Sequence, residues 1–207
     1  MFKCEKAYAK INLSLDITGK RADGYHLLET VMQSVSLYDT VRVERAEEFS
    51  VSCSNPHVPL QGNIAEKAAR AFLAAAGLSG GASIHIEKRI PMEAGMAGGS
   101  TDAAAVLRAL NSLCGERFSR QELCSIGAGI GADVPFCVVV GTCLARGIGE
   151  QLTPLPSMMP CRILVVKPSE GISTAAAYRM LDESGLSLSG TAAVVQALQA
   201  GNLKALG

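Results

Sequence analysis

The sequence predicts an α+β protein. Residues 6–18 and 28–45 alternate apolar with polar side chains, as half-buried strands do. Later segments repeat apolar residues every three or four positions, which is the period of a helix, and short strand-like runs lie between them. With 207 residues and 48% hydrophobic content, the chain can bury a core large enough for one large domain or one and a half ordinary ones.

Composition narrows the class of protein. The charges of the 19 basic and 19 acidic residues cancel, so no overall electrostatic field attracts nucleic acid or an anionic membrane. No apolar run approaches the roughly 20 residues of a membrane span, and no signal-peptide pattern is present. The seven cysteines never form a Cys-x-x-Cys pair, and the three histidines lack metal-ligand spacing. We therefore expect a cytoplasmic protein without a structural metal, nucleic-acid partner or membrane partner; its oligomeric state stays open.

The first half of the chain contains two strands, a helix and a third strand. A turn signal at residues 19–24 separates the two long strands. A helix is expected over 63–76, with Asn63 as its N-cap, Glu66 completing a capping box and Gly77 at its end. Residues 83–90 then alternate again, with isoleucines on one face, which predicts another half-buried strand.

A glycine-rich segment, residues 91–102, joins that strand to a helix. Apolar residues recur at helical spacing from Ala103 to Leu113, so Ser100 or Thr101 is the expected N-cap. A phosphate placed there would meet free backbone N–H groups and the positive end of the helix dipole. The pattern matches neither the Walker A loop nor the dinucleotide-binding fingerprint. The alternative is a tight connection whose glycines serve backbone geometry alone.

The second half is read as further short helices and strands. Ser119 and Glu122 form a second capping box, and glycines between 127 and 131 end that helix. The apolar runs 134–140 and 162–167 are interpreted as strands. Ser173 or Thr174 is expected to cap a helix that runs through Leu181, and the prolines between 154 and 160 mark a possible boundary of a second lobe.

Three groups of polar residues interrupt the apolar segments. Lys10 and Asn12 lie on one face of the first strand, where a solvated strand face is the simpler interpretation. Tyr25 and His26 follow a turn, where an amphipathic pair at a strand entrance would suffice. Asp133 lies among apolar neighbours, and a buried carboxylate needs a partner or a function, although a turn or cap aspartate is the alternative.

Together these segments resemble the GHMP kinases, a superfamily of small-molecule kinases. The glycine-rich segment alone indicates only the superfamily. The strings Ala-Lys-Ile-Asn-Leu at 9–13, Gly-Lys-Arg-Ala-Asp-Gly-Tyr-His at 19–26 and Gly-Ala-Asp-Val-Pro-Phe at 131–136 are similar to the branch whose acceptor is 4-diphosphocytidyl-2-C-methyl-D-erythritol. The resemblance extends from about Ala9 to Tyr178.

The resemblance implies a two-lobed fold and a reaction. We expect a ribosomal-protein-S5-like lobe over 1–156 and the start of a ferredoxin-like lobe over 157–207, which lacks the third motif of the family. ATP with Mg²⁺ would phosphorylate the 2-hydroxyl of the cytidylyl-erythritol, a step in the non-mevalonate synthesis of isoprenoid precursors.

The resemblance also implies site residues, one by one. Asp133 would accept the hydroxyl proton, Lys10 would stabilise the alkoxide and the γ-phosphate, and Asn12 would support their geometry. Tyr25 would stack on cytosine and His26 would hydrogen-bond its edge, with Thr174 nearby. The nucleotide would contact residues of the glycine-rich segment and two others, with Ser100 or Thr101 near Mg²⁺: Asn63, Lys88, Pro91, Gly95, Met96, Ala97, Gly98, Gly99, Ser100 and Thr101.

Two other functions are compatible with parts of the pattern. A GHMP kinase for another small alcohol, such as mevalonate or homoserine, has no use for the nucleobase contacts of Tyr25 and His26. A catalytically dead nucleotide-binding module would have no need of both Lys10 and Asp133. Ala97 stands where the superfamily often has glycine, and it would be strained if that position requires a positive φ.

Overall fold

The structure is a computed structural model that describes residues 1–168, 174–184 and 189–206. The chain forms two compact units. The first unit comprises Met1–Ala9, Val35–Pro91 and Ala97–Val140, and the second comprises Lys10–Ser34, Met92–Met96 and the residues from Gly141 onward. Strands and helices follow one another along the chain, which confirms the α+β class. The lobe boundary at residue 156 stays a prediction.

Two long paired strands begin the chain and pass through both units. They are β1 (Phe2–Lys20) and β2 (His26–Ala46), each longer at both ends than the sequence predicted. The turn between them is closed by the Arg21 N–H, which donates to the Tyr25 carbonyl at 2.7 Å. Gly24 has a φ of +89°, a conformation that glycine adopts without strain.

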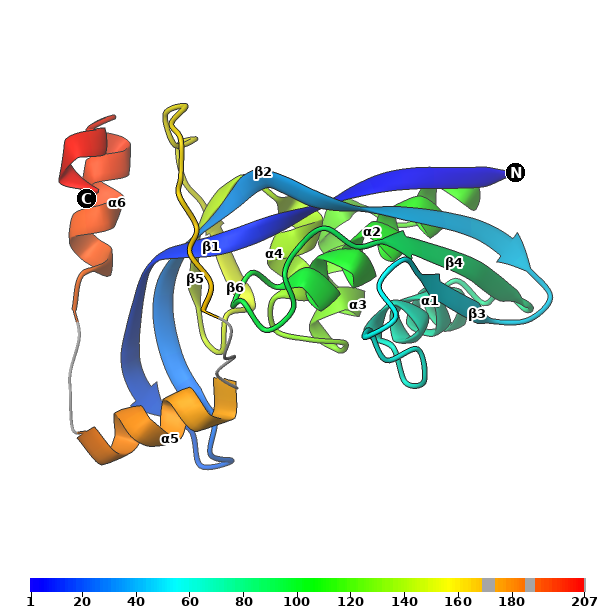
Figure 1. Cartoon of the computed structure of the whole chain (residues 1–207), viewed down its shortest axis with the longest axis horizontal. Coiled ribbons are helices and arrows are strands. Elements are labelled where there is room, and N and C mark those ends of the chain that lie inside the picture. The colour runs from blue at the N-terminus through cyan, green and yellow to red at the C-terminus, as the bar shows by residue number, and fades with distance from the viewer. Residues whose placement is uncertain (169–173, 185–188, 207) are drawn as a thin grey trace. The chain divides into compact units, whose positions relative to one another are not determined.

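In the first unit, helices pack beside a small sheet (Figure 1). The second part of β2 pairs antiparallel with β4 (Gly81–Glu87), and β3 (Ser50–Cys53) pairs parallel with β4. Val41, Val43, Ile84 and Ile86 alternate along β2 and β4 and are fully buried, which is the expected half-buried pattern. The helices are α1 (Ile64–Ala75), α2 (Gly98–Leu113), α3 (Arg120–Ala128) and α4 (Val134–Val139).

The capping predictions for α1 and α3 are confirmed in most details. The Asn63 side chain accepts from the Ala65 N–H at 2.9 Å and begins α1, and Gly77 follows its end with a φ of +63°. The expected reciprocal bond from Glu66 is replaced by an ion pair with Arg70 one turn further on. Ser119 and Glu122 form a complete capping box at the start of α3.

In the second unit, the first part of β2 pairs antiparallel with β5 (Thr142–Arg146), which pairs with β6 (Gln151–Pro154). Helices α5 (Thr174–Ser184) and α6 (Thr191–Gln199) and the 3₁₀ turn η1 (Leu203–Ala205) follow. The Asp16 carboxylate accepts from the Thr191 N–H at 2.9 Å and so satisfies the N-terminus of α6 from a distant strand. Val31, Leu144 and Leu198 form a small core. The sequence reasoning missed β3, β5, β6 and α6.

The apolar run 134–140 is a helix, α4, and its interpretation as a strand was wrong. Val134, Pro135, Phe136, Cys137 and Val138 are all buried, so no polar face reveals a period of 3.6 residues. The better signal was Pro135, because proline in the first turn of a helix loses no hydrogen bond and already has a helical φ.

The run 162–167 forms neither helix nor strand, so the predicted strand is not observed. Leu164 is 89% exposed and Val166 is 79% exposed. A strand needs a partner for its backbone groups, and none of the described strands pairs with this run. Helix α5 is confirmed and extends three residues past Leu181, whereas the alternative cap Ser173 lies outside the described residues. Within the described ranges, every helix is too short or too polar to traverse a bilayer.

Candidate functional site

Helix α2 begins earlier than predicted, at Gly98. Ala97 is the N-cap residue, and no described side chain caps this N-terminus, so the assignment of Ser100 or Thr101 as the cap was wrong. The Thr101 N–H donates to the Ala97 carbonyl, which leaves the amides of Gly98, Gly99 and Ser100 without an intrahelical acceptor. Three such amides together with the helix dipole are the donors that a bound anion requires, and the phosphate contacts predicted for these residues stay predictions.

Two glycines of this turn are also closely packed against neighbouring side chains. A Cβ on Gly98 would lie 3.0 Å from Lys88 Nζ, and a Cβ on Gly99 would lie 3.2 Å from Ile64 Cγ2. Ala97 has a φ of +56°, so the strain expected at this position is present. Gly95, with a φ of +68°, serves backbone geometry, as the simpler interpretation expected. Gly98 and Gly99 in addition allow close packing around the first turn of α2.

The two hydroxyls of the turn have different environments. The Thr101 hydroxyl donates to the Tyr8 carbonyl at 2.7 Å, and Thr101 is fully buried. That hydroxyl therefore anchors α2 to β1. Ser100 is only half buried, so it is the better placed of the two to meet Mg²⁺ or a phosphate.

The turn that contains Asp133 lies beside the first turn of α2. A Cβ on Gly131 would lie 3.9 Å from Ser100 Oγ, and the Val134 N–H donates to the Gly131 carbonyl. Asp133 is half buried at the N-cap position of α4, but its side chain makes no capping hydrogen bond. The alternative interpretation of Asp133 as a turn or cap residue is thus confirmed for its position, although not for a capping hydrogen bond, and its catalytic role stays a prediction.

Lys88 lies between two carboxylates. Its Nζ is 2.6 Å from Asp39 Oδ2 and 2.7 Å from Asp102 Oδ2, and its side chain is only 7% exposed. Burial opposes its charge, but the neighbouring carboxylates, Asp102 foremost, raise the pKa of Lys88 above its ordinary value. Burial raises the pKa of Asp102 to about 7, against the opposing effect of Lys88 and with added repulsion from Asp39. Sequence reasoning found Lys88 but neither of its partners.

Both the oxygen and the nitrogen of the Asn63 side-chain amide form hydrogen bonds. Its Oδ1 caps α1, and its Nδ2 donates to the Pro59 carbonyl at 2.9 Å. The capping interpretation is thus confirmed. The nucleotide contacts predicted for Asn63 and Lys88 stay predictions.

In the second unit, Lys10 belongs to a chain of hydrogen bonds. Its Nζ donates to Asn12 Oδ1 at 2.7 Å, and Asn12 Nδ2 donates to Thr30 Oγ1 at 2.7 Å. Lys10 is buried, so its interpretation as part of a solvated strand face was wrong. Its backbone N–H donates to the carbonyl of Met96, which connects β1 to the glycine-rich segment at the residue before Ala97. The structure thus brings Lys10, Asn12 and Met96 together.

His26 is held by residues of α5. Its ring stacks on Tyr178 at a centroid distance of 4.7 Å, and its Nε2 lies 2.7 Å from Asp182 Oδ1. Lys20 donates to the other oxygen of Asp182, and these hydrogen bonds lower the pKa of the Asp182 carboxyl. Tyr25 is 61% exposed. Thr174 begins α5, but its side chain lies outside the described residues.

Tyr178 and Asp182 were missed as neighbours of His26. Their spacing of four residues on a helix was the available signal, because it places both on one face. Nothing in the sequence indicated that this face contacts His26.

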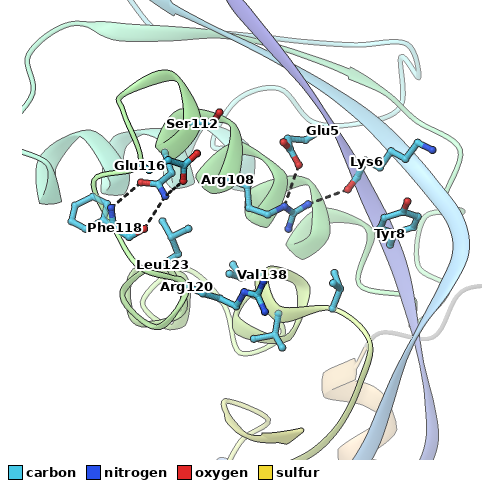
Figure 2. A pocket seen from close by; sticks show the side chains of 13 residues that line it. Glu5, Lys6, Tyr8, Arg108, Ser112, Glu116, Phe118, Arg120, Leu123 and Val138 are labelled. Carbon is cyan, nitrogen blue, oxygen red and sulfur yellow. Dashed lines mark hydrogen bonds and ion pairs between the residues drawn. The ribbon is translucent and has the colours of Figure 1, made fainter. Parts of the chain in front are cut away.

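A separate cavity of about 680 Å³ lies in the first unit and contains none of the predicted site residues (Figure 2). The guanidinium of Arg108 is already engaged there, because it donates to Glu5, to the Lys6 carbonyl and to the Cys137 carbonyl. Asn111 likewise bonds to Glu116 and Phe118. The side chains of Arg108 and Asn111 are thus engaged with other groups of the protein. In the described part of the chain, no three His, Cys, Asp or Glu side chains gather as metal ligands.

The sequence of this chain is similar to that of known kinases. Residues 63–141 match the GHMP kinases N terminal domain. The chain is 49% identical over 203 residues to the 4-diphosphocytidyl-2-C-methyl-D-erythritol kinase of Caldicellulosiruptor saccharolyticus, a match that covers 96% of this chain and 70% of that protein. It is 51% identical over 178 residues to the kinase of the same name from Acetivibrio thermocellus, covering 85% of this chain and 63% of the relative.

Solved structures agree on the fold. A crystal structure of 4-(cytidine 5'-diphospho)-2C-methyl-D-erythritol kinase superimposes with a TM-score of 0.76 at 36% identity, over 96% of this chain and 72% of that one. A mevalonate kinase from L. major, at 20% identity and a TM-score of 0.70, shares the fold over 99% of this chain and 72% of its own. The chain thus spans about two thirds of the length of these relatives. By sequence and by fold, it belongs to the 4-diphosphocytidyl-2-C-methyl-D-erythritol kinase family of the GHMP kinases.

Proposed function

We propose that this protein transfers the γ-phosphoryl group of ATP to the 2-hydroxyl of 4-diphosphocytidyl-2-C-methyl-D-erythritol, in the synthesis of isoprenoid precursors. The observation that carries the proposal is the combination of close relatives named for this kinase with an uncapped helix N-terminus at the glycine-rich segment. Phosphoryl transfer needs positioning and neutralisation of charge more than covalent chemistry, and an uncapped N-terminus contributes to both.

The phosphates of ATP would lie against the amides of Gly98, Gly99 and Ser100. Mg²⁺ would be held chiefly by phosphate oxygens, with Ser100 as its protein ligand, because the Thr101 hydroxyl is committed to Tyr8. When bound, the ion neutralises charge on the transferred phosphoryl group. Pro91, Gly95, Met96 and Ala97 complete the segment, and Asn63 and Lys88 are proposed near the base.

Asp133 is the proposed acceptor of the hydroxyl proton. Its turn lies beside Ser100, and its carboxylate is not used as a helix cap. Lys10 is proposed to stabilise the alkoxide and the phosphate, and its hydrogen bond to Asn12 fixes the position of its ammonium group. Buried and oriented, such groups need no reorganisation when charge develops during the reaction.

The cytidine end of the substrate is proposed to contact Tyr25 and His26, with Thr174 nearby. The exposed ring of Tyr25 offers a face for stacking, while His26 is already oriented by Tyr178 and Asp182. A cytoplasmic location and the lack of nucleic-acid and membrane partners stay predictions.

The test is a phosphoryl-transfer assay with three acceptors: the cytidylyl-erythritol, mevalonate and homoserine. We expect transfer to the first alone. Asp133→Asn should lower kcat by about 10²–10⁴ while ATP still binds, because a positioned proton acceptor contributes that much. Glu47→Gln, the same change of carboxylate to amide at an exposed residue of the first unit, is the matched control and should be fully active.

Transfer to mevalonate or homoserine at a comparable rate would contradict the proposed acceptor. Near-full turnover by Asp133→Asn would contradict the role of Asp133. ATP binding without transfer to any of the three would indicate a nucleotide-binding module in place of a kinase.

A further inference from the structure

A chain of hydrogen bonds begins at a backbone carbonyl of β1 and ends at the ammonium group of Lys10. The Thr30 hydroxyl donates to the Ser14 carbonyl, and Thr30 Oγ1 accepts from Asn12 Nδ2 at 2.7 Å. Asn12 Oδ1 in turn accepts from Lys10 Nζ at 2.7 Å. All four residues belong to the second unit, and Thr30 has no exposed surface. Bulk water therefore does not compete for the Thr30 hydroxyl.

The direction of each hydrogen bond in this chain is set by the group before it. A backbone carbonyl can only accept, so the one proton of the Thr30 hydroxyl points to Ser14. The Thr30 oxygen then presents its lone pairs to the NH2 group of Asn12. The carbonyl oxygen of the Asn12 amide consequently faces Lys10, whose ammonium group has donors only.

The reverse orientation of the Asn12 amide is unfavourable at both of its ends. The oxygen and nitrogen of an amide have nearly the same shape, so hydrogen bonding, not packing, selects between the two orientations. If the amide were reversed, Nδ2 would face the ammonium group of Lys10, donor against donor. Oδ1 would face the Thr30 oxygen, whose proton is committed to Ser14. Without the Thr30 hydroxyl, the observed orientation would leave Nδ2 without its acceptor, which is costly away from water.

We propose, on the basis of the proposed kinase function, that Thr30 is a positioning residue for phosphoryl transfer. Its hydroxyl fixes the orientation of the Asn12 amide, and that amide holds the Lys10 ammonium group where it stabilises the alkoxide and the phosphate. Thr30 acts in this role through Asn12. A group that is oriented before the reaction needs no reorganisation when charge develops, so loss of this orientation lowers the rate of the chemical step more than it weakens binding.

The test compares Thr30→Val, which keeps the shape of threonine without the hydroxyl, with Thr30→Ser, which keeps the hydroxyl. The assay is phosphoryl transfer from Mg·ATP to 4-diphosphocytidyl-2-C-methyl-D-erythritol. Thr30→Val should lower kcat by about 10–100-fold with little change in either KM, because a small displacement of a catalytic group has an effect of that size. Thr30→Ser should retain most of the activity.

Thr142→Val is the matched control for these variants. Thr142 is also a buried threonine of the second unit, and its hydroxyl donates to Gln33 Oε1 outside the chain of hydrogen bonds that leads to Lys10. This variant loses a buried hydroxyl in the same way as Thr30→Val, and its kcat should be unchanged. A purely structural role of Thr30 would lower the thermal midpoint of both valine variants and leave the kcat of the folded protein alone.

Full kcat in Thr30→Val, or an equal loss in Thr142→Val, would overturn the positioning role and leave the kinase function standing. A loss that Thr30→Ser shares would overturn it as well, because the hydroxyl would not be the cause. If the wild type transfers no phosphoryl group, the kinase function is contradicted and the role of Thr30 with it.

Should Thr30→Val fail to fold, hydrogen exchange of the side-chain amides of the wild type decides, measured by NMR. The NH2 group of Asn12 donates to a buried oxygen, so it should exchange more slowly than that of Gln61, which is exposed. Equally fast exchange of the two amides would overturn the proposal, because Thr30 would then not hold the Asn12 amide.

Discussion

Each unit contains a lysine that forms an ion pair with aspartate, but one of these ion-pair clusters is buried and the other is exposed. In the first unit, Lys88 bridges Asp39 and Asp102 in the interior. In the second unit, Lys20 and His26 share Asp182 near the surface. Burial raises the pKa of Asp102 to about 7, whereas hydrogen bonds from Lys20 and His26 lower the pKa of Asp182. The pKa values of the two aspartates therefore shift in opposite directions, because burial dominates at Asp102 and hydrogen bonding dominates at Asp182.

The largest difference should appear when each lysine is removed. Lys88→Met leaves two buried carboxylates without their shared cation, and breaking a buried pair in this way costs about 3–5 kcal/mol. Lys20→Met is the matched change at the surface, where water replaces the lost partner, and its effect should be much smaller. Urea unfolding at pH 7 measures both. Similar losses for the two variants would mean that burial is not the deciding variable.

The two aspartates should give opposite dependences of stability on pH. Since the pKa of Asp102 is raised from 3.8 to about 7, the native state binds the extra proton between these values. Its contribution to the free energy of unfolding then falls by up to about 1.4 kcal/mol for each pH unit from pH 4 to pH 7. Asp102→Asn should remove this slope.

For Asp182, the lowered pKa means that its contribution is present above about pH 4 and is lost as the pH falls below that value. Asp182→Asn should therefore differ from the wild type at neutral pH, and the difference should shrink in acid. Unfolding free energies measured from pH 3 to pH 8 test both variants. If the contributions of Asp102 and Asp182 to stability changed with pH in the same direction, the contrast between the buried and the exposed aspartate would be contradicted.

The smallest effect concerns backbone strain at the N-terminus of α2. Ala97, with a φ of +56°, is in the left-handed region, which costs a residue with a Cβ roughly 1–2 kcal/mol. Glycine avoids this cost but loses more chain entropy on folding. Ala97→Gly should therefore stabilise the protein by about 0.5–1 kcal/mol in thermal or urea unfolding. A loss of stability would show that the Ala97 methyl group contributes packing that outweighs the strain.

Local signals predicted local structure well. Asn63, Ser119 and Glu122 cap their helices as their spacing indicated, and alternation located β1 and β2. Lys10 and Asp133 stood out because polar residues inside apolar segments need a reason. The run 134–140 was misread because a segment buried on every side has no polar face, and α2 was misplaced because glycines, which are poor helix formers, make its first turn.

Contacts between residues far apart in the sequence could not be predicted from local patterns. Lys88 meets Asp39 across 49 positions and Asp102 across 14, and His26 meets Asp182 across 156. Helical or strand periodicity does not link the two residues of any of these pairs. Sequence analysis therefore identified Lys88 and His26 as candidates but not the carboxylates that set their electrostatics.

The long first strand also has consequences for synthesis on the ribosome. Glu5 contacts Arg108 in the first unit, and Asp16 contacts Thr191 in the second, which is made 175 positions later. At about 5–20 residues per second, Asp16 leaves the ribosome roughly 9–35 s before its partner exists. Throughout that interval the outer edge of β1 lacks its later neighbours and is open to association with other nascent chains. Early pairing with β2 is thus the protection available to β1 while the rest of the chain is still being translated.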